Sequence, residues 1–484
     1  MSSIVEIIIL LFITLSGFLS SSQSDELYKT HLAGIIVLLL LCLIILFKSR
    51  NRNLGQKKWV STFYLFLVAY FIVHFQKFID ILVLPNMDDI FGVYNNHEVV
   101  LRTAYISLLG FEGLILGYLC FSRKLKSLNY NSHFQQVSLC TTSRLRVIAF
   151  VQFLAVVLFI FYNGSIYLAR GYSQEMINQM SGSMNAYVVI LVDFMTYAAI
   201  IINAAILNRN QKDLNLVSFL RSFPVLFHVS VIVYLSFVLI SGDRGPIITY
   251  FLAILYGYLL VSKKNINIFR ILVIFFVASL SISIMGIVRQ DRAVNGSLKG
   301  SKNYYNTVMA GESVMPLTDE LAHSNRTAIW AVESTPDLYP YRYGFYTINN
   351  LISVIPFSNS ILNALGLNLL AYSKYGHSGA FLDWYSQGDN VTAGVGTSTV
   401  ADIYLDFGPY GVLIVLFILG MILCKADYIL YNVKSSSISL WWQVVGIVLF
   451  SNSVYMARSV MLFQLRNVVW LYLVMLLIFK LGKK

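Results

Sequence analysis

The stretch Val395-Gly-Thr-Ser-Thr-Val-Ala-Asp-Ile-Tyr404 closes a long polar segment that begins at Val288 and carries Arg289 at its entrance. On both sides of this segment lie apolar runs long enough to span a bilayer. The chain therefore leaves the membrane at length in this one place. We expect any active site to be covered by the 288–404 segment.

The composition around this segment is that of an integral membrane protein. Apolar residues make up 57% of the chain and charged residues 12%, against roughly 45–50% and 25% in soluble domains. A soluble globular protein is thereby excluded. Twelve segments qualify as membrane spans, and the chain is predicted to be all-α and polytopic with a large, partly helical periplasmic loop. The spans lie near 4–20, 32–47, 59–75, 103–121, 147–162, 186–207, 223–240, 246–261, 269–287, 403–424, 440–456 and 467–481.

The position of the basic residues sets the orientation. Six short connections contain 21 of the 35 lysines and arginines, and all six fall on the same side of a twelve-span chain. The positive-inside rule makes that side cytoplasmic and puts both termini inside. The net charge of +12 is thus explained by topology, and we expect no nucleic-acid partner. These connections are Lys48–Lys58, Arg123–Arg146, Arg209–Arg221, Lys263–Arg270, Lys425–Lys434 and Lys480–Lys484.

The predicted organisation has three parts. Residues 1–287 hold the first nine helices, 288–402 form the outer loop, and 403–484 hold the last three helices. None of the four cysteines lies in the outer loop, so neither a disulfide framework nor a cysteine metal site is expected there. We predict no cofactor and no metal.

Several arginines lie on the outer side, against the positive-inside bias. One is Arg244 in the turn Ser241-Gly-Asp-Arg-Gly-Pro246, where a guanidinium could hold a phosphate or merely pair with Asp243. Arg289 and Arg292 follow where the ninth span emerges, and Arg326 and Arg342 lie inside the loop. An external anion is the simplest common explanation for these outward arginines.

Three side chains near the end of the loop are candidates for a general base. His377 and Asp383 lie in the run Tyr375–Tyr385, and Asp402 lies where the chain returns to the membrane. Each could take a proton from a sugar hydroxyl. A histidine in a loop is also often structural, and Asp402 could instead cap its helix. Trp384 and Tyr385 suit stacking on sugars, although an aromatic belt at the membrane interface explains them equally well.

The sequence leaves the roles of four other acidic residues open. Glu112 and Asp193 fall inside predicted spans, where a carboxylate is either functional or a hydrogen-bonded helix contact. Asp88 and Asp89 lie in the connection near 76–102. Paired carboxylates can hold a divalent ion that neutralises a phosphate leaving group, although a solvated loop is the simpler interpretation.

The run Gly396-Thr-Ser-Thr-Val-Ala-Asp-Ile-Tyr-Leu-Asp-Phe-Gly-Pro-Tyr-Gly411 resembles the end of the large periplasmic loop of Wzy-type O-antigen polymerases. The turn Ser241–Pro246 is similar to the arginine turn of that family, and the twelve-span layout matches over essentially the whole chain. The resemblance implies a bacterial inner-membrane glycosyltransferase with its active site facing the periplasm. Such enzymes move a growing glycan from undecaprenyl diphosphate to the non-reducing end of a new lipid-linked repeat unit.

The resemblance also assigns roles and partners. Arg244 and Arg289 would hold the diphosphate, with Arg292 and Arg326 as further candidates, and His377 is similar in placement to the essential histidine of related ligases. Partners would be an undecaprenyl-diphosphate-linked oligosaccharide, membrane lipid, a chain-length regulator and a flippase.

Two other function classes are consistent with a polytopic chain. A flippase or secondary transporter of lipid-linked glycan would show short outer loops and a repeated half, and the 288–404 segment argues against it. A metal-dependent polytopic glycosyltransferase would use Asp88 and Asp89. Loss of activity on chelation would separate it from a polymerase.

Overall fold

A computed structural model gives the architecture of the chain. Among the residues it describes there are helices and no strands, which confirms the all-α prediction. Eight described helices are long and apolar enough to cross a membrane, and two more are shorter apolar helices. All predicted spans except the ninth fall on helices, and the ninth lies outside the described residues. The structure describes residues 2–20, 28–53, 60–84, 92–125, 141–168, 184–209, 214–241, 243, 245–262, 313–315, 318–356, 358, 361, 364–366, 376–391, 394–432 and 438–481.

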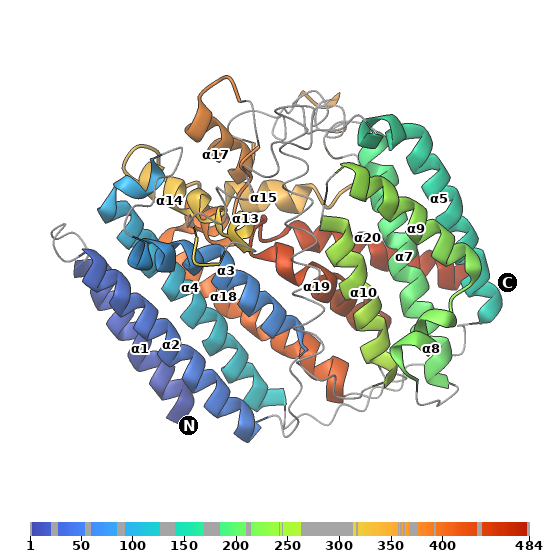
Figure 1. Ribbon diagram of the computed structural model, residues 1–484, viewed down its shortest axis with the longest axis horizontal. Helices are drawn as coiled ribbons and strands as arrows, with labels where there is room; N and C mark the ends of the chain where they lie inside the picture. The colour runs from blue at the N-terminus through green and yellow to red at the C-terminus, as the bar shows by residue number, and fades with distance from the viewer. Residues whose placement is uncertain are drawn as a thin grey trace. The chain divides into compact units, whose positions relative to one another are not determined.

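The chain divides into two compact units. Unit 1 comprises Met1–Asn129, Asn306–Asp427 and Ser453–Arg466, and unit 2 comprises the remainder. Unit 1 holds all the described helices of the 288–402 segment, and Figure 1 shows them gathered at one end of its long helices. We call this the loop end of unit 1. Its long helices are α1 (Ser2–Ser20), α2 (Tyr28–Asn53), α3 (Thr62–Val83), α4 (His97–Leu125) and α18 (Thr399–Asn432), of which α18 belongs to it as far as Asp427. Its short ones are η2 (Val93–Asn95), α13 (Asp319–Ala322), α14 (Asn325–Ser334), α15 (Phe345–Ile352) and α17 (Ser378–Gln387).

Unit 2 has a core of aromatic and small aliphatic side chains. Phe159, Tyr234 and Tyr250 are buried together with several valines, and Asp193 accepts a hydrogen bond from the Tyr250 hydroxyl at 3.0 Å. That bond gives this intramembrane carboxyl group a packing role. The helices wholly in unit 2 are α5 (Thr142–Leu168), α7 (Met184–Arg209), α8 (Leu216–Arg221), α9 (Val225–Ser241) and α10 (Gly245–Ser262), while α19 (Leu440–Met456) and α20 (Phe463–Leu481) belong to it in part.

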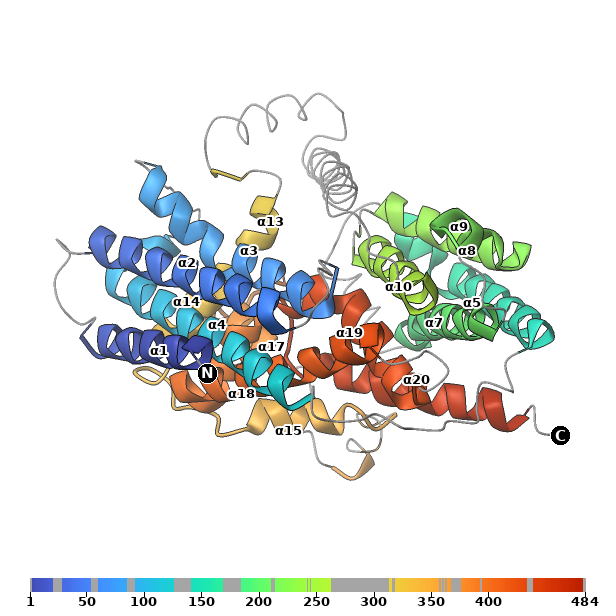
Figure 2. The same ribbon diagram turned by 90° about the horizontal axis from the view of Figure 1, so that it is seen from below.

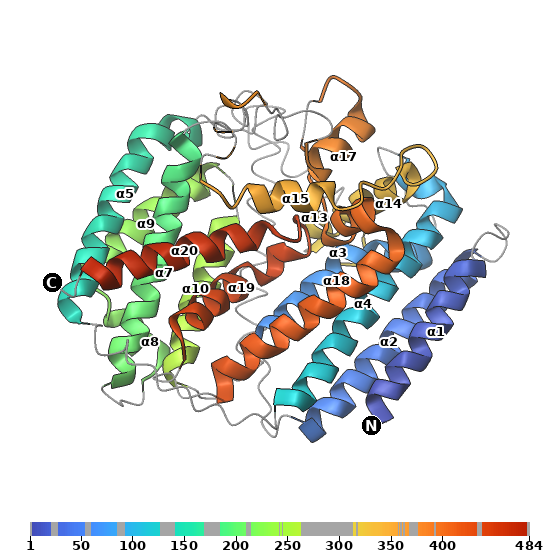
Figure 3. The same cartoon turned by 180° about the vertical axis from the view of Figure 1, so that it is seen from behind.

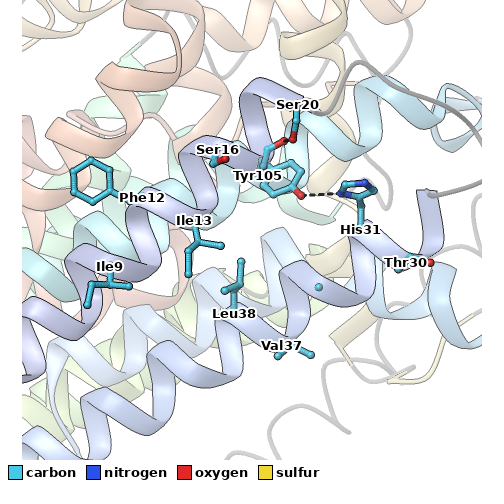
Figure 4. A pocket seen from close by; sticks show the side chains of 12 residues that line it. Ile9, Phe12, Ile13, Ser16, Ser20, Thr30, His31, Val37, Leu38 and Tyr105 are labelled. Atoms are coloured by element: carbon cyan, nitrogen blue, oxygen red, sulfur yellow. Dashed lines mark hydrogen bonds between the residues drawn. The ribbon is translucent and has the colours of Figure 1, made fainter.

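In unit 1, α1, α2 and α4 lie side by side (Figure 2). Glu112 of α4 is wholly buried and accepts a hydrogen bond from the Thr14 hydroxyl of α1 at 2.8 Å. The contact joins two helices of the bundle, as expected for a carboxyl group that stabilises packing. A pocket of about 810 Å³ opens between these helices. Its lining is mainly apolar, with a hydrogen bond between His31 and Tyr105 at 3.1 Å (Figure 4).

Helices α4 and α18 run alongside each other at very short range (Figure 3). A Cβ atom on Gly117 would lie 2.0 Å from the carbonyl oxygen of Phe417, and one on Gly420 would lie 2.2 Å from that of Leu114. Glycines at such positions let two helix backbones approach closely, as is usual in membrane helix pairs. We call this contact the glycine seam. It fixes the position of α18, which carries Asp402.

One end of α18 binds the beginning of α3, and the helix is broken near its other end. At one end, the carboxylate of Asp427 accepts the backbone N–H groups of Thr62 and Phe63 at 2.8 and 3.2 Å, and so satisfies the first turn of α3. Near the other end, Gly408 has φ +70, which favours glycine, and Pro409 follows it. The break leaves a short first segment, Thr399 to Phe407, at the loop end.

The loop is anchored to α3 by a buried ion-pair cluster. The Lys77 ammonium is 2% exposed and lies 2.5 Å from Asp319 and 3.6 Å from Asp80. The other oxygen of Asp80 accepts the N–H of Val314 at 2.8 Å. Asp80, which the sequence places in an outer connection, thus belongs to α3 and fastens the loop to it.

Candidate active site

The first segment of α18 forms the centre of the candidate site. The side chain of Asp402 is 5% exposed. One carboxylate oxygen accepts the Ser378 hydroxyl at 2.5 Å and the other accepts the backbone N–H of Met461 at 3.1 Å. Asp402 thereby joins the beginning of α17 to the turn between α19 and α20. Both of its oxygens are used in doing so.

Thr399 binds the same turn. Its backbone N–H donates to the carbonyl of Ala457 at 3.1 Å, and its hydroxyl donates to the carbonyl of Met456. Together with the Met461 contact, these bonds fix the turn against the first residues of α18. The turn lies about 60 residues further along the sequence than Thr399 and Asp402, which hold it.

Asp406 repeats the arrangement one helical turn further along. Its two oxygens accept the N–H groups of Tyr346 and Thr347 at 3.1 and 2.8 Å, and the Thr347 hydroxyl donates at 2.7 Å. A carboxylate placed at the beginning of α15 satisfies N–H groups that have no partner within that helix. Its spacing of four residues from Asp402 is visible in the sequence, since both acids then lie on one helix face.

His377 is the N-cap of α17. Its Nδ1 accepts the backbone N–H of Ala380 at 3.0 Å, so the neutral ring carries its proton on Nε2. Burial lowers the pKa of His377, which favours this neutral form at pH 7. The nitrogen that would act as a base is therefore engaged in capping, and the ring presents an N–H donor.

Asp383 has a different arrangement. Its Oδ1 accepts the backbone N–H groups of Val395 and Gly396 at 2.6 and 3.2 Å. Its Oδ2 makes no hydrogen bond within the described part of the chain, and the residue is half-buried. Burial raises the pKa of the Asp383 carboxyl group, and the two N–H groups offset part of that rise. One oxygen orients this carboxylate while the other remains accessible.

The arginines are only partly described. Arg244, Arg289 and Arg292 lie outside the described residues, as do Asp88 and Asp89. Arg326 lies on α14, which packs against α17, and its Nε donates to the carbonyl of His323 at 3.2 Å. The structure thus brings Arg326 to the same group of short helices as His377 and Asp383, with Asp402 bonded to that group through Ser378.

Two further arginines lie at the loop end: Arg342, which the sequence places among the outward arginines, and Arg458, which was not predicted from the sequence. The Arg342 guanidinium lies 5.8 Å from the centre of the Phe381 ring on α17, within the range of a cation–π contact. Arg458 lies on the turn that Thr399 and Asp402 hold. The sequence predicts that this turn faces outward, against the positive-inside bias, and that is a signal that could have identified Arg458.

Aromatic side chains pack together at α17, the helix that carries Asp383. The ring of Tyr339 lies 5.5 Å from that of Phe381 and 5.9 Å from that of Trp384, both edge to face. The Trp384 indole N–H donates to Asp389 at 2.9 Å, which fixes the plane of the ring. Tyr339 and Trp384 are half-exposed, and aromatic rings with carboxylates at their edges can bind the apolar and hydroxyl faces of a sugar. Within the ranges that the structure describes, no group of three or more metal-ligating side chains occurs.

Comparison with known proteins gives one family. A family model described as O-antigen polysaccharide polymerase Wzy matches residues 3–483. The comparisons with curated proteins and with solved structures give no match.

Proposed function

The chain belongs to the Wzy family of O-antigen polysaccharide polymerases, and on that premise we propose that it transfers a growing glycan from undecaprenyl diphosphate to the non-reducing end of a new lipid-linked repeat unit. The family match covers essentially the whole chain and supports an O-antigen polymerase acting on lipid-linked repeat units in the membrane. The donor, the direction of transfer and the residues are our proposal.

The reaction requires one bond to form and one to break. The acceptor hydroxyl oxygen attacks the anomeric carbon of the donor, the bond from that carbon to the diphosphate oxygen breaks, and the acceptor proton passes to a base. The diphosphate leaves on the polyprenyl chain with an added negative charge. A polymerase of this kind therefore needs a base near the acceptor and cations near the diphosphate.

The Asp383 side chain supports this proposal most directly, because its Oδ2 accepts no hydrogen bond from the residues that the structure describes. Of the three candidates for the base, Asp402 uses both oxygens in hydrogen bonds and His377 uses Nδ1 as a cap. Asp383 is oriented through Oδ1, and its Oδ2 faces no donor among the described residues. We assign proton removal to Asp383 and assign Asp402 and His377 to positioning the segments around it.

The cations are assigned to the arginines of the outer side. Arg244, Arg289, Arg292 and Arg326 are the proposed diphosphate-binding residues, because a guanidinium keeps its charge at any relevant pH and binds phosphate oxygens in pairs. The aromatic rings around Trp384 would bind the acceptor sugar beside Asp383.

Reconstitution tests the reaction itself. Purified protein in vesicles that contain the host's lipid-linked repeat unit should convert single repeats into a ladder and release undecaprenyl diphosphate. A chelator should not change the yield. A transporter would move the intact lipid-linked unit across the bilayer without any ladder, and a chelator-sensitive ladder would favour the metal-dependent class.

The orientation is tested by reporter fusions. A reporter inserted after Gln387, beyond α17, should be active only in the periplasm, and one at the C-terminus only in the cytoplasm, because the basic turns face inward. The opposite pattern would place Asp383 in the cytoplasm and remove it from a periplasmic reaction.

A further inference from the structure

The turn between α19 and α20 carries an arginine with an unusual environment. Arg458 follows directly after Met456 and the buried Ala457, and it is itself half-buried. Its backbone N–H donates to the carbonyl of Tyr455 at 3.0 Å. Its guanidinium makes no ion pair or hydrogen bond within the described part of the chain. A partly desolvated positive charge without a counter-ion is unfavourable, and a bound anion would relieve that cost.

The backbone of this turn is held in place. Thr399 donates to the carbonyls of Met456 and Ala457, and Asp402 accepts the N–H of Met461. These contacts lie on either side of Arg458 in the sequence. A side chain on a fixed backbone binds its ligand with less loss of conformational freedom, so the turn presents the guanidinium in a preorganised way.

Asp402 does not neutralise this arginine. Its two oxygens accept from Ser378 and Met461, at distances suited to hydrogen bonds. A contrast is provided by Arg102 in the same unit, whose guanidinium lies 3.8 Å from the carboxylate of Asp337. Arg102 therefore has a counter-ion on the protein, whereas Arg458 has none among the residues that the structure describes.

We propose that Arg458 binds a lipid-linked phosphate group at the loop end of unit 1, and that Asp402 and Thr399 position it for this purpose. The turn joins two apolar helices, so it lies where lipid phosphates are found. The shared chemistry is a phosphate on a membrane lipid, and the donor diphosphate is the source that fits the neighbouring candidate site. This identification of the lipid rests on the proposed function.

Direct binding tests the proposal. Full-length protein in phosphatidylcholine nanodiscs would be titrated with undecaprenyl diphosphate, undecaprenol and phosphatidylglycerol. Replacing Arg458 with alanine should weaken diphosphate binding about tenfold or more, since hydrogen bonds to charged groups are among the stronger ones. Arg458→Lys should fall between alanine and the wild type, because it keeps the charge but loses the planar fork. Undecaprenol binding should not change.

Arg102→Ala is the matched control. It removes an outer arginine of the same unit that already has a carboxylate partner, and diphosphate affinity should remain that of the wild type. The thermal midpoints of the Arg458 variants should equal the wild-type value. Equal diphosphate affinity in the wild type and Arg458→Ala overturns the proposal. Binding of phosphatidylglycerol alone, lost in Arg458→Ala, overturns the diphosphate assignment.

A double-mutant cycle tests the role of Asp402. An alanine at 402 would remove both acceptors, so the Ser378 hydroxyl and the Met461 N–H would lose their partner and the turn would shift. Asp402→Ala should therefore weaken diphosphate binding, and adding Arg458→Ala should cause little further loss. Additive losses in the double variant would show that Asp402 does not act through Arg458.

Polymerisation separates this proposal from the proposed function. Wild-type protein that binds undecaprenyl diphosphate through Arg458 but builds no ladder contradicts the proposed function and supports the present inference. Full ladders and unchanged binding in Arg458→Ala overturn the inference and leave the proposed function intact.

Discussion

Replacing Asp383 with asparagine should reduce the polymerisation rate by about 10²–10⁴-fold, the contribution typical of a general base. The asparagine carbonyl oxygen can still accept the N–H groups of Val395 and Gly396, so the loop should keep its conformation. Only the basic oxygen is lost. Cells carrying this variant should make glycans of a single repeat while the lipid-linked precursor accumulates, measured by gel electrophoresis and by extraction of the lipid fraction.

The pH profile adds an independent measurement. A base must be unprotonated, so kcat/KM should rise with pH through the pKa of Asp383 and fall as pH drops below it. Burial raises that pKa, so the acid limb should lie above the value of an ordinary aspartate. The Asp383→Asn variant should have lost this limb, because asparagine does not titrate.

Asp337→Asn serves as a control, since Asp337 is 69% exposed and pairs with Arg102 at 3.8 Å. Polymer length and the pH profile should both be unchanged in it. Wild-type ladders from Asp383→Asn would contradict the assignment. The base would then lie elsewhere, or the activated donor would need none.

Much of the fold follows from local physical properties of the sequence. A membrane helix satisfies its own backbone hydrogen bonds, so an apolar run of sufficient length predicts a helix without knowledge of any partner. Even so, the boundary of α3 differs from expectation. Asp80 lies in the helix because Lys77 and the N–H of Val314 satisfy its carboxylate, and both contacts depend on tertiary structure.

The sequence selects His377, Asp383 and Asp402 as candidate residues, and the structure adds how each of them is bonded. His377, Asp383 and Asp402 were identified from residue type and position alone. The three residues differ in which of their atoms already make hydrogen bonds, and these bonds join residues that are distant in the sequence. Met461, which donates to Asp402, lies 59 residues away from it, and Val395, which donates to Asp383, lies 12 residues away. A pattern in a single sequence does not reveal which residues form these hydrogen bonds. It likewise does not reveal that Thr399 holds the turn that carries Arg458.

The glycine seam gives the second large effect, on stability. Replacing Gly117 with alanine would put a Cβ atom 2.0 Å from the carbonyl oxygen of Phe417. The contact is with backbone, so rotation of a side chain cannot relieve it and the two helices must separate. Overpacking of this kind typically costs about 1–3 kcal/mol and sometimes more. We expect a lower thermal midpoint and less monodisperse protein, measured by fluorescence-detected size exclusion after heating in detergent.

Gly34 provides the matched control for the seam. It lies in the apolar helix α2, and a Cβ atom there would meet nothing within 4 Å. Gly34→Ala should be neutral or slightly stabilising, because alanine favours a helix by about 1 kcal/mol over glycine. Gly420→Ala, which meets the Leu114 carbonyl at 2.2 Å from the opposite helix, should resemble Gly117→Ala. Since α18 also carries Thr399 and Asp402, both seam variants should lose polymer along with stability. A wild-type thermal midpoint in Gly117→Ala would show that α4 and α18 do not approach this closely.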